Sequence, residues 1–217
     1  MAKLNLVKQV ENAILYQDEK DQLYIRIDNV RGSYVFVGTP ANDEGDDGET
    51  RQKWRIVLML PKKTHLEAKN LIVEVINRLI KENVNVPKER WFIKNGDEHE
   101  DENMHGHWLV SASDGRYRPK ARDAQGHVID EIDEIDDTFY SGCWLHALIR
   151  PWFFDGKTKN SKKTFPKRIS AGLNSVMFAR DDKPFGSGRI DDSEVWGDDD
   201  GMGGGRGDDD MDDADDL

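Results

Sequence analysis

The sequence contains a single cysteine, Cys143, among its 217 residues. One thiol excludes an intrachain disulfide, and a zinc site would have to form without the usual pair of thiolates. No apolar run approaches the roughly 18 residues of a membrane-spanning helix. The first ten residues also lack the charged-then-apolar layout of a secretion signal. We therefore expect a protein of a reducing, cytoplasmic compartment that is neither secreted nor inserted in a membrane.

Motifs for nucleotide or metal chemistry are also missing. The glycines at 203–207 lie in an acidic stretch rather than between a strand and a helix, so nucleotide hydrolysis has no support. His99, His105 and His107 lie among acids, but their spacing matches no known metal motif, and we expect a solvated loop. The sequence thus predicts no metal and no cofactor. A metal-dependent nuclease that uses the acidic runs 43–49 and 130–137 stays as an alternative, although no lysine is placed as a catalytic partner.

Excess positive charge, the usual mark of a nucleic-acid-binding protein, is absent, because the formal net charge is -12. Residues 191–217 hold thirteen acidic residues and one basic residue, Arg206, so this segment accounts for the whole excess. The remainder, 1–190, is neutral. A segment of Asp and Gly buries too little apolar surface to fold. We expect one domain over 1–190 and a disordered acidic tail over 191–217.

The body is predicted to be mainly β with one main α-helix. Residues rich in β-branched and aromatic side chains predict strands at 23–27, 32–38, 53–60, 107–113, 140–154 and 168–180. The helix is expected over about 64–83, where Thr64 and Glu67 have capping-box spacing and apolar residues recur on one face. Short strands, polar loops and one helix indicate a small Greek-key barrel similar to the oligonucleotide-binding fold.

The stretch "YSGCWLHALIRPWFF", residues 140–154, is the most informative strand. Alternation places Cys143, Leu145, Ala147 and Ile149 on a core face. The opposite face is aromatic and basic, and it carries Tyr140, Trp144, His146, Arg150 and Trp152. Proteins that bind single strands combine a positive groove with aromatic platforms, each base stack contributing about 1–3 kcal/mol. The alternative is that Trp144 and Trp152 cover a second side of the core.

Basic residues and aromatics recur together in three further segments. The loop at 157–168 offers Lys157, Lys159, Lys162 and Lys163 as phosphate contacts. A second cluster contains Arg116, Tyr117, Arg118 and Lys120, and the strand at 53–60 adds Lys53 and Arg55. We predict that these residues, with the aromatic and basic face of 140–154, bind DNA. The lysines could instead be a solvated hairpin tip.

Two segments, "DTFYSGCW" and "RISAGLNSVMFARDDKPFGSG", together with an acidic tail that ends on an apolar residue, resemble the single-stranded DNA-binding proteins of tailed bacteriophages. The resemblance implies an oligonucleotide-binding fold and a non-enzymatic protein that coats single-stranded DNA during phage replication and recombination. It also implies a location in the cytoplasm of the infected bacterium. The tail would dock on replication partners such as the phage polymerase and helicase. A homodimer is compatible with the sequence.

The tail is predicted to compete with DNA. The tether gives the polyanion an effective concentration of roughly millimolar at the basic groove. Bound DNA would displace the tail and release it to a partner. The residues predicted to bind a partner are Asp208, Asp209, Asp210, Asp212, Asp213, Asp215, Asp216 and Leu217. The other interpretations are a solubilising tail, and an acidic module that mimics DNA. The neutral body disfavours the mimic, because a mimic carries its negative charge on the folded surface.

Overall fold

The computed structural model describes residues 3–45, 48–80, 84–157 and 164–185. The chain divides into Met1–Phe185 and Gly186–Leu217. The predicted acidic tail, 191–217, therefore lies outside the described residues, and the domain boundary predicted at 190 stays a prediction. None of the helices in the described part of the chain is long and apolar enough to cross a membrane.

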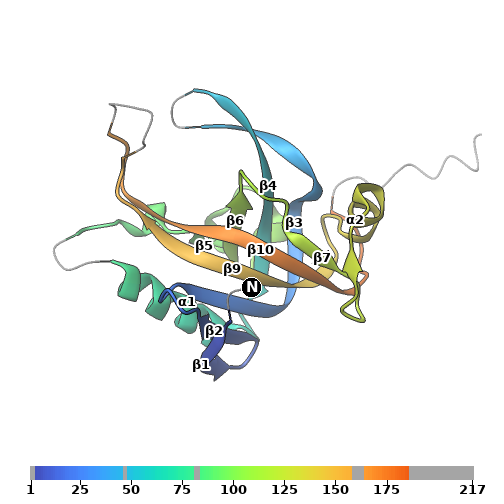
Figure 1. Cartoon of the computed structure of the whole chain (residues 1–217), viewed down its shortest axis with the longest axis horizontal. Coiled ribbons are helices and arrows are strands. Elements are labelled where there is room, and N and C mark those ends of the chain that lie inside the picture. The colour runs from blue at the N-terminus through green and yellow to red at the C-terminus, as the bar shows by residue number, and fades with distance from the viewer. Residues whose placement is uncertain (1–2, 46–47, 81–83, 158–163, 186–217) are drawn as a thin grey trace, which may run out of the picture. The chain divides into compact units, whose positions relative to one another are not determined.

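The described part of the chain is mainly β, as predicted (Figure 1). The strands are β1 (Asn5–Val10), β2 (Ala13–Gln17), β3 (Leu23–Glu44), β4 (Thr50–Pro61), β5 (Ile93–Asn95), β6 (His107–Asp114), β7 (Lys120–Arg122), β8 (Val128–Ile129), β9 (Trp144–Phe154) and β10 (Arg168–Arg180). The helices are α1 (Leu66–Leu79) and α2 (Ile132–Thr138), with short 3-10 turns at Lys88–Arg90, Gly96–Glu98 and Glu102–Met104.

The strands form one sheet in the order β5-β6-β4-β3-β9-β10-β7-β8, and β2 joins β1 to the first part of β3. All pairings are antiparallel except that of β10 with β7. No ladder between described residues joins β6 to β10, so the hydrogen-bonded sheet is open, although the two strands are in contact. The expected barrel therefore does not close through backbone hydrogen bonds.

Strand β3 is a single bent element where two separate strands were predicted. It pairs with β2 and β9 through its first half and with β4 through its second half. Its ladders shift register between Ile27 and Val30 and between Ser33 and Phe36. Bulges of this kind bend a strand and increase its twist. The acids after Ala41 continue β3 to Glu44 instead of forming the expected long interruption.

Helix α1 confirms the main predicted helix. Its buried residues are those of the predicted apolar face, namely Ala68, Leu71, Ile72, Val75 and Ile76. The helix contacts β1, β2, β3 and β9 (Figure 1). The predicted capping box is wrong, because His65 is the N-cap and makes no capping hydrogen bond with its side chain. Glu67 instead accepts a hydrogen bond from the backbone N–H of Glu11 at 3.3 Å.

The acidic run 130–137, which the nuclease alternative would use, contains helix α2. Ile135 is buried in the core, while the acids on either side of it are exposed. Asp136 accepts hydrogen bonds from the backbone N–H and the hydroxyl of Thr39, at 3.1 and 2.6 Å. One apolar residue per helical turn is enough to anchor the segment against β3, and a scan for strand patterns does not detect it.

The last described residues fold back across the start of β9. The backbone N–H of Phe185 donates to Ser141 O at 2.8 Å, and Arg31 Nη2 donates to Lys183 O at 2.8 Å. Gly142 lies beneath this segment with a φ of +117°, and a Cβ there would lie 2.5 Å from Lys183 O. Only glycine fits without a shift of the backbone.

We predict that Gly142→Ala destabilises the fold by about 1–3 kcal/mol, because alanine would meet both an unfavourable φ and a steric overlap. Gly126→Ala is the matched control, since Gly126 has a φ of +87° but no atom within 4 Å of an added Cβ. Thermal unfolding should show the larger decrease in Tm for Gly142→Ala. Equal decreases would mean that the contact with Lys183 contributes nothing to stability.

Cys143 provides a second test of the fold. The residue is fully buried, and burial raises the pKa of its thiol to about 11. Because the thiolate is the reactive species, we predict no reaction with a disulfide reagent at pH 8 in the native state and complete reaction in denaturant. Rapid labelling of the folded protein would contradict the packing of β9.

Candidate nucleic-acid interface

A groove of about 730 Å³ lies between β4, β6 and the first residues of β10. Its floor is apolar and buried, and includes Ile56, Ala112, Ile169 and Ala171. Its walls carry charged and aromatic side chains from β3, β4, β10 and the segment 89–94. We call this cavity the main groove. An apolar floor with polar walls offers space for bases and donors for a phosphate backbone.

Four basic side chains line the main groove, from three elements and one turn: Arg55, Arg90, Lys94 and Arg168. Arg55 is held in place, because its Nη1 lies 3.2 Å from Asp43 Oδ1 and its guanidinium lies 5.3 Å from the ring centre of Phe36. Its Nε is buried and has no hydrogen-bond partner in the described structure. Arg55 is therefore anchored to its own chain at the wall of the groove.

Three aromatic residues line the main groove: the buried Phe92, and Tyr34 and Trp91, which are more accessible. Tyr34 is 47% exposed and has a φ of +48°, a left-handed conformation that bulky residues rarely adopt. It lies at the register shift of β3 between Ser33 and Phe36. The half-buried Trp91 is fixed by a hydrogen bond from its Nε1 to Val86 O at 3.0 Å. Strained, exposed residues cluster at functional sites.

A smaller cavity of about 330 Å³ shares Asp43, Ser113, Arg168 and Ser170 with the main groove. It adds Lys53, whose Nζ lies 2.7 Å from Asp43 Oδ2, and the rings of Phe154 and Phe165. The guanidinium of Arg168 lies 4.6 Å from the ring centre of Phe154. Of the predicted DNA-binding residues, the structure thus places Lys53 and Arg55 at these cavities.

The predicted phosphate-binding loop begins at the same place. Lys157 is exposed, and the backbone N–H of Phe165 donates to Gly156 O at 2.8 Å, which joins the two ends of the loop. A Cβ on Gly156 would lie 2.1 Å from Phe165 O, so this close approach requires glycine. Lys159, Lys162 and Lys163 lie outside the described residues. Their role stays a prediction.

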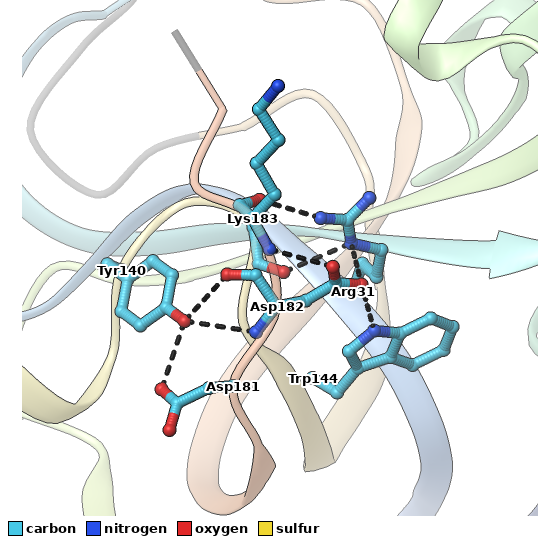
Figure 2. Close-up of polar contacts among 7 residues, drawn as sticks. Arg31, Tyr140, Trp144, Asp181, Asp182 and Lys183 are labelled. Atoms are coloured by element: carbon cyan, nitrogen blue, oxygen red, sulfur yellow. Dashed lines mark hydrogen bonds and ion pairs between the residues drawn. The ribbon is translucent and has the colours of Figure 1, made fainter. Parts of the chain in front are cut away.

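The alternation predicted for β9 is present, and Cys143, Leu145, Ala147 and Ile149 are buried. On the other face, Tyr140 and Trp144 bind the segment 180–183 (Figure 2). Trp144 Nε1 donates to Asp182 Oδ2 at 2.7 Å, and the Arg180 guanidinium lies 4.1 Å from the Trp144 ring centre. The Tyr140 hydroxyl donates to Asp181 Oδ1 at 3.0 Å. Base stacking on either ring stays a prediction and would compete with these contacts.

Asp182 is the centre of this cluster in Figure 2. The hydrogen bond from Trp144 and the backbone N–H of Lys183, with Arg31 nearby, hold the pKa of the Asp182 carboxyl below its usual value. The Arg31 Nε atom lies 3.5 Å from Asp182 Oδ2. Burial raises the pKa of the Tyr140 hydroxyl. Asp182 is therefore a carboxylate at neutral pH and Tyr140 a neutral hydrogen-bond donor.

The remaining residues of this face also contact their own chain. His146 Nδ1 lies 2.7 Å from Asp28 Oδ1, and Arg150 Nη1 donates to Gln22 Oε1 at 3.1 Å. Burial alone would raise the pKa of Asp28, but hydrogen bonds from His146 and Arg26 outweigh it and lower the pKa. Trp152 is 39% exposed and packs edge to face with Phe154. Trp152 is thus the member of the predicted face that lies next to the smaller cavity.

None of the residues of the cluster at 116–120 lines these cavities. Tyr117 is 75% exposed, and its backbone N–H donates to Asp114 Oδ1 at 2.9 Å. Arg118 Nη2 donates to Asp130 O at 2.9 Å, while Arg116 and Lys120 are exposed. The cluster thus lines neither cavity, although it begins beside Lys53, since a Cβ on Gly115 would lie 3.7 Å from Lys53 Cγ.

Within the described residues, acidic and histidine side chains do not gather into a metal site. In the described residues, no group of three or more His, Cys, Asp or Glu side chains is placed to hold an ion. Asp97 accepts hydrogen bonds from Lys62 and the backbone of Gly106, which lower the pKa of its carboxyl. His105 Nε2 bonds His99 O at 2.9 Å. The residues of this loop thus bond one another and the body.

Four residues at the main groove were missed in the sequence: Tyr34, Arg90, Trp91 and Lys94. The stretch "KERWFIK" at 88–94 carries the same pairing of basic and aromatic residues that marked the predicted segments. A search for that pairing alone would have found it. Nothing in the sequence around Tyr34 distinguishes this exposed tyrosine from an ordinary strand residue.

Comparison with known proteins identifies the family. A family model described as Enterobacter phage Enc34, ssDNA-binding protein, matches residues 23–204. The solved single-stranded DNA-binding protein from bacteriophage Enc34 is 33% identical, with a TM-score of 0.70 over 89% of this chain and 99% of that chain. No curated protein matches this sequence.

Two further structures of that protein are similar to this chain. Its complex with single-stranded DNA is 34% identical, with a TM-score of 0.72 over 85% of this chain and 99% of that chain. Its C-terminal truncation is 34% identical, with a TM-score of 0.72 over 84% of this chain and 98% of that chain. The chain belongs to the family of the single-stranded DNA-binding protein of Enterobacter phage Enc34.

Proposed function

We propose that this chain binds single-stranded DNA without sequence preference along the main groove and the smaller cavity. Bases stack on Tyr34 and Trp91, while Arg55, Lys94 and Arg168 contact phosphates. The observation that carries the proposal is the combination in one groove of aromatic rings, four basic side chains and an apolar floor. Such a surface holds a strand by stacking and charge, and neither reads the base sequence.

Family membership supports the proposal. One solved structure of the relative is a complex with single-stranded DNA, and nearly the whole length of that relative aligns with this chain. The function of the family is DNA binding, which is not an enzymatic activity. The metal-dependent nuclease is therefore disfavoured. An acidic DNA mimic is disfavoured as well, because the cavity walls are basic.

We infer from the strand order that the domain is an oligonucleotide-binding barrel. The position of the main groove agrees with the binding face of such a barrel. The five long strands follow the order β6-β4-β3-β9-β10, and β10 contacts β6. In such barrels, oligonucleotides bind on the second and third strands between two flanking loops. Here these strands correspond to β4 and β6, and the loops to 45–49 and 155–167. The inferred binding face and the observed cavities coincide.

The other residues predicted from the sequence keep a place in this proposal. Trp152 and Lys157 lie beside Phe154 and the base of the 155–167 loop, where they extend the binding surface. Tyr140, Trp144, His146 and Arg150, and the cluster Arg116, Tyr117, Arg118 and Lys120, lie outside the cavities. The substitutions of Tyr117 and Trp144 described below test whether these two groups contribute to DNA binding.

We further propose that the protein acts in phage replication and recombination in the cytoplasm of the infected bacterium. Its acidic residues at 208–216 compete with DNA for the basic groove, and DNA binding releases them. The released segment, with Leu217 at its end, docks on a polymerase or helicase. The proposal rests on charge and composition: thirteen acidic residues lie within 191–217, whereas 1–190 is neutral.

Substitutions at the main groove test the DNA-binding proposal. We predict that Tyr34→Ala weakens binding of oligo-dT by about 1–3 kcal/mol, the contribution of one base stack. Lys94→Ala should make the slope of log K against log salt less steep by about 0.7, the value for one lost phosphate contact on a single strand. Fluorescence titrations at two or more salt concentrations measure both quantities.

Tyr117→Ala and Trp144→Phe are the matched comparisons, because both aromatic rings lie outside the cavities. Their oligo-dT affinity should equal that of the unaltered protein. A loss at Trp144 without a loss at Tyr34 would place the DNA on the outer face of β9, and a loss at Tyr117 without a loss at Tyr34 would place it at the cluster 116–120. Either result would contradict the groove. Circular dichroism and Tm confirm that each variant is folded.

Deletion of 191–217 tests the tail. We predict tighter binding of oligo-dT, most strongly at low salt, because a competing polyanion has been removed and its competition is screened by ions. A full-length variant with the seven aspartates at 208–216 changed to asparagine should reproduce the effect. Unchanged affinity in both proteins would remove the competition model and leave a solubilising tail.

Leu217→Ala separates partner docking from competition. The substitution keeps every aspartate, so DNA affinity should stay unchanged while binding to the phage polymerase or helicase weakens. Pull-down of each purified partner in the presence of saturating oligo-dT measures this. Equal partner binding by both proteins would assign docking to the charges alone.

A further inference from the structure

A second large cavity lies outside the main groove. It has a volume of about 710 Å³ and is formed by one side of α1, the segment 88–95 and the start of β6. Its walls include Lys69 and Val73 of α1, Lys88, Trp91 and Trp108. We call it the helix-side cavity. The function proposed above uses only Trp91 and Lys94 of its lining, the two residues at its border with the main groove.

The helix-side cavity adjoins the main groove. Glu89, Trp91 and Lys94 line both cavities, so Trp91 and Lys94 stand where one ends and the other begins. The Trp91 indole is held there by its hydrogen bond to Val86 O. A strand bound in the main groove and stacked near Trp91 therefore leads directly to the second cavity.

The helix-side cavity contains a second aromatic platform. Trp108 is half-buried, and the Nζ atom of Lys69 lies 5.9 Å from its ring centre. The Trp108 indole N–H makes no hydrogen bond to the described part of the chain. A ring that is supported by the core, with a cation beside it and a free donor, is suited to stack a base next to a phosphate.

Two lysines of this cavity, Lys69 and Lys88, differ from many basic residues of the domain in their lack of an ion pair among the described residues. Lys8, Lys53, Arg55, Lys62 and Arg78 are all within ion-pair distance of an acidic side chain. Within the described residues, Lys69 and Lys88 have no acidic partner, although they lie near Glu89 and Glu98 at the cavity walls. Glu98 is engaged by Asn95 at 3.0 Å. Lysines without ion pairs are available for an anionic ligand.

We propose that the helix-side cavity is a second subsite for single-stranded DNA. The strand continues past Trp91, stacks a base on Trp108 and places phosphates at Lys69 and Lys88. This inference rests on the proposed function, since it extends the same bound strand. In this proposal, helix α1 binds DNA directly through Lys69. The packing of the helix on the domain accounts only for its buried face.

An acidic peptide is the rival ligand, because lysines and an apolar wall also fit aspartates with an apolar terminus. The shared residues Trp91 and Lys94 favour DNA. A ligand confined to the helix-side cavity would not need that cavity to be continuous with the main groove. A long DNA strand that occupies both cavities does need this continuity.

The test is a length series of oligo-dT, from about 4 to 16 nucleotides, bound to the full chain and to the double variant Lys69→Glu, Lys88→Glu. The variant should bind the shortest oligonucleotides as the unaltered protein does, because these fill the main groove alone. It should lose about tenfold in affinity for the longest ones, since two phosphate contacts become repulsive. The gain in affinity with length should thus shrink.

Lys20→Glu, Lys63→Glu is the matched control, because both lysines are exposed and neither lines a cavity. Equal binding by both double variants at every length would overturn the proposal. So would an equal loss at every length in the Lys69, Lys88 variant. If the unaltered protein binds no oligonucleotide at all, the proposed function itself has failed, and this outcome is distinct.

Photocrosslinking gives a second measurement that does not depend on charge. Oligonucleotides with 5-iodouracil should crosslink to the peptide that contains Trp108 when they are long, and not when they are short. If instead the double variant binds all oligonucleotides normally but no longer responds to deletion of 191–217, the cavity holds the acidic segment. That result would overturn the DNA subsite.

Discussion

The path of β3 is the constraint on which the other elements depend. One continuous strand pairs with β2 and β9 and then with β4, so it must bend to reach all of them. The bend is made at register shifts of its ladders, and Asn29 and Tyr34, which lie within the first two of these shifts, have positive φ values. Bulges increase twist and re-aim side chains. The second shift presents Tyr34 to the main groove, so the same distortion that curves the sheet also exposes an aromatic ring.

The two faces of β9 have different tasks. One face fills the core, and the other binds the chain that follows β10 through Trp144, Tyr140 and Asp182. These contacts hold the residues up to Phe185 against the domain, and the acidic segment follows them in the sequence. The basic residues at the main groove come from other strands and from the segment 89–94. Alternation along a strand identifies the outward face, but it does not tell whether DNA or another part of the chain covers that face.

Much of the architecture could be predicted from the sequence. The helical spacing of Ala68, Leu71, Ile72, Val75 and Ile76 identified α1, and strand patterns located β4, β6, β9 and β10. The site was predicted less well. Of the residues predicted to bind DNA, Lys53 and Arg55 lie at the cavities. The prediction did not include Tyr34 and Trp91, because a groove joins residues from strands that are distant in sequence. The capping box at Thr64 failed because the His65 ring bonds Thr64 and Asp28 O instead.

The sequence alone determined the class of the fold, the resemblance to phage DNA-binding proteins and the separation of charge between 1–190 and 191–217. These properties are local or additive, since periodicity and composition do not depend on which strands are neighbours. Only the tertiary structure decided which basic and aromatic residues lie together. The DNA-binding face predicted from the sequence was the outer face of β9, whereas the main groove lies at β4, β6 and β10. Strand pairing, bulges and the return of β10 to β6 bring the side chains of these strands into one groove.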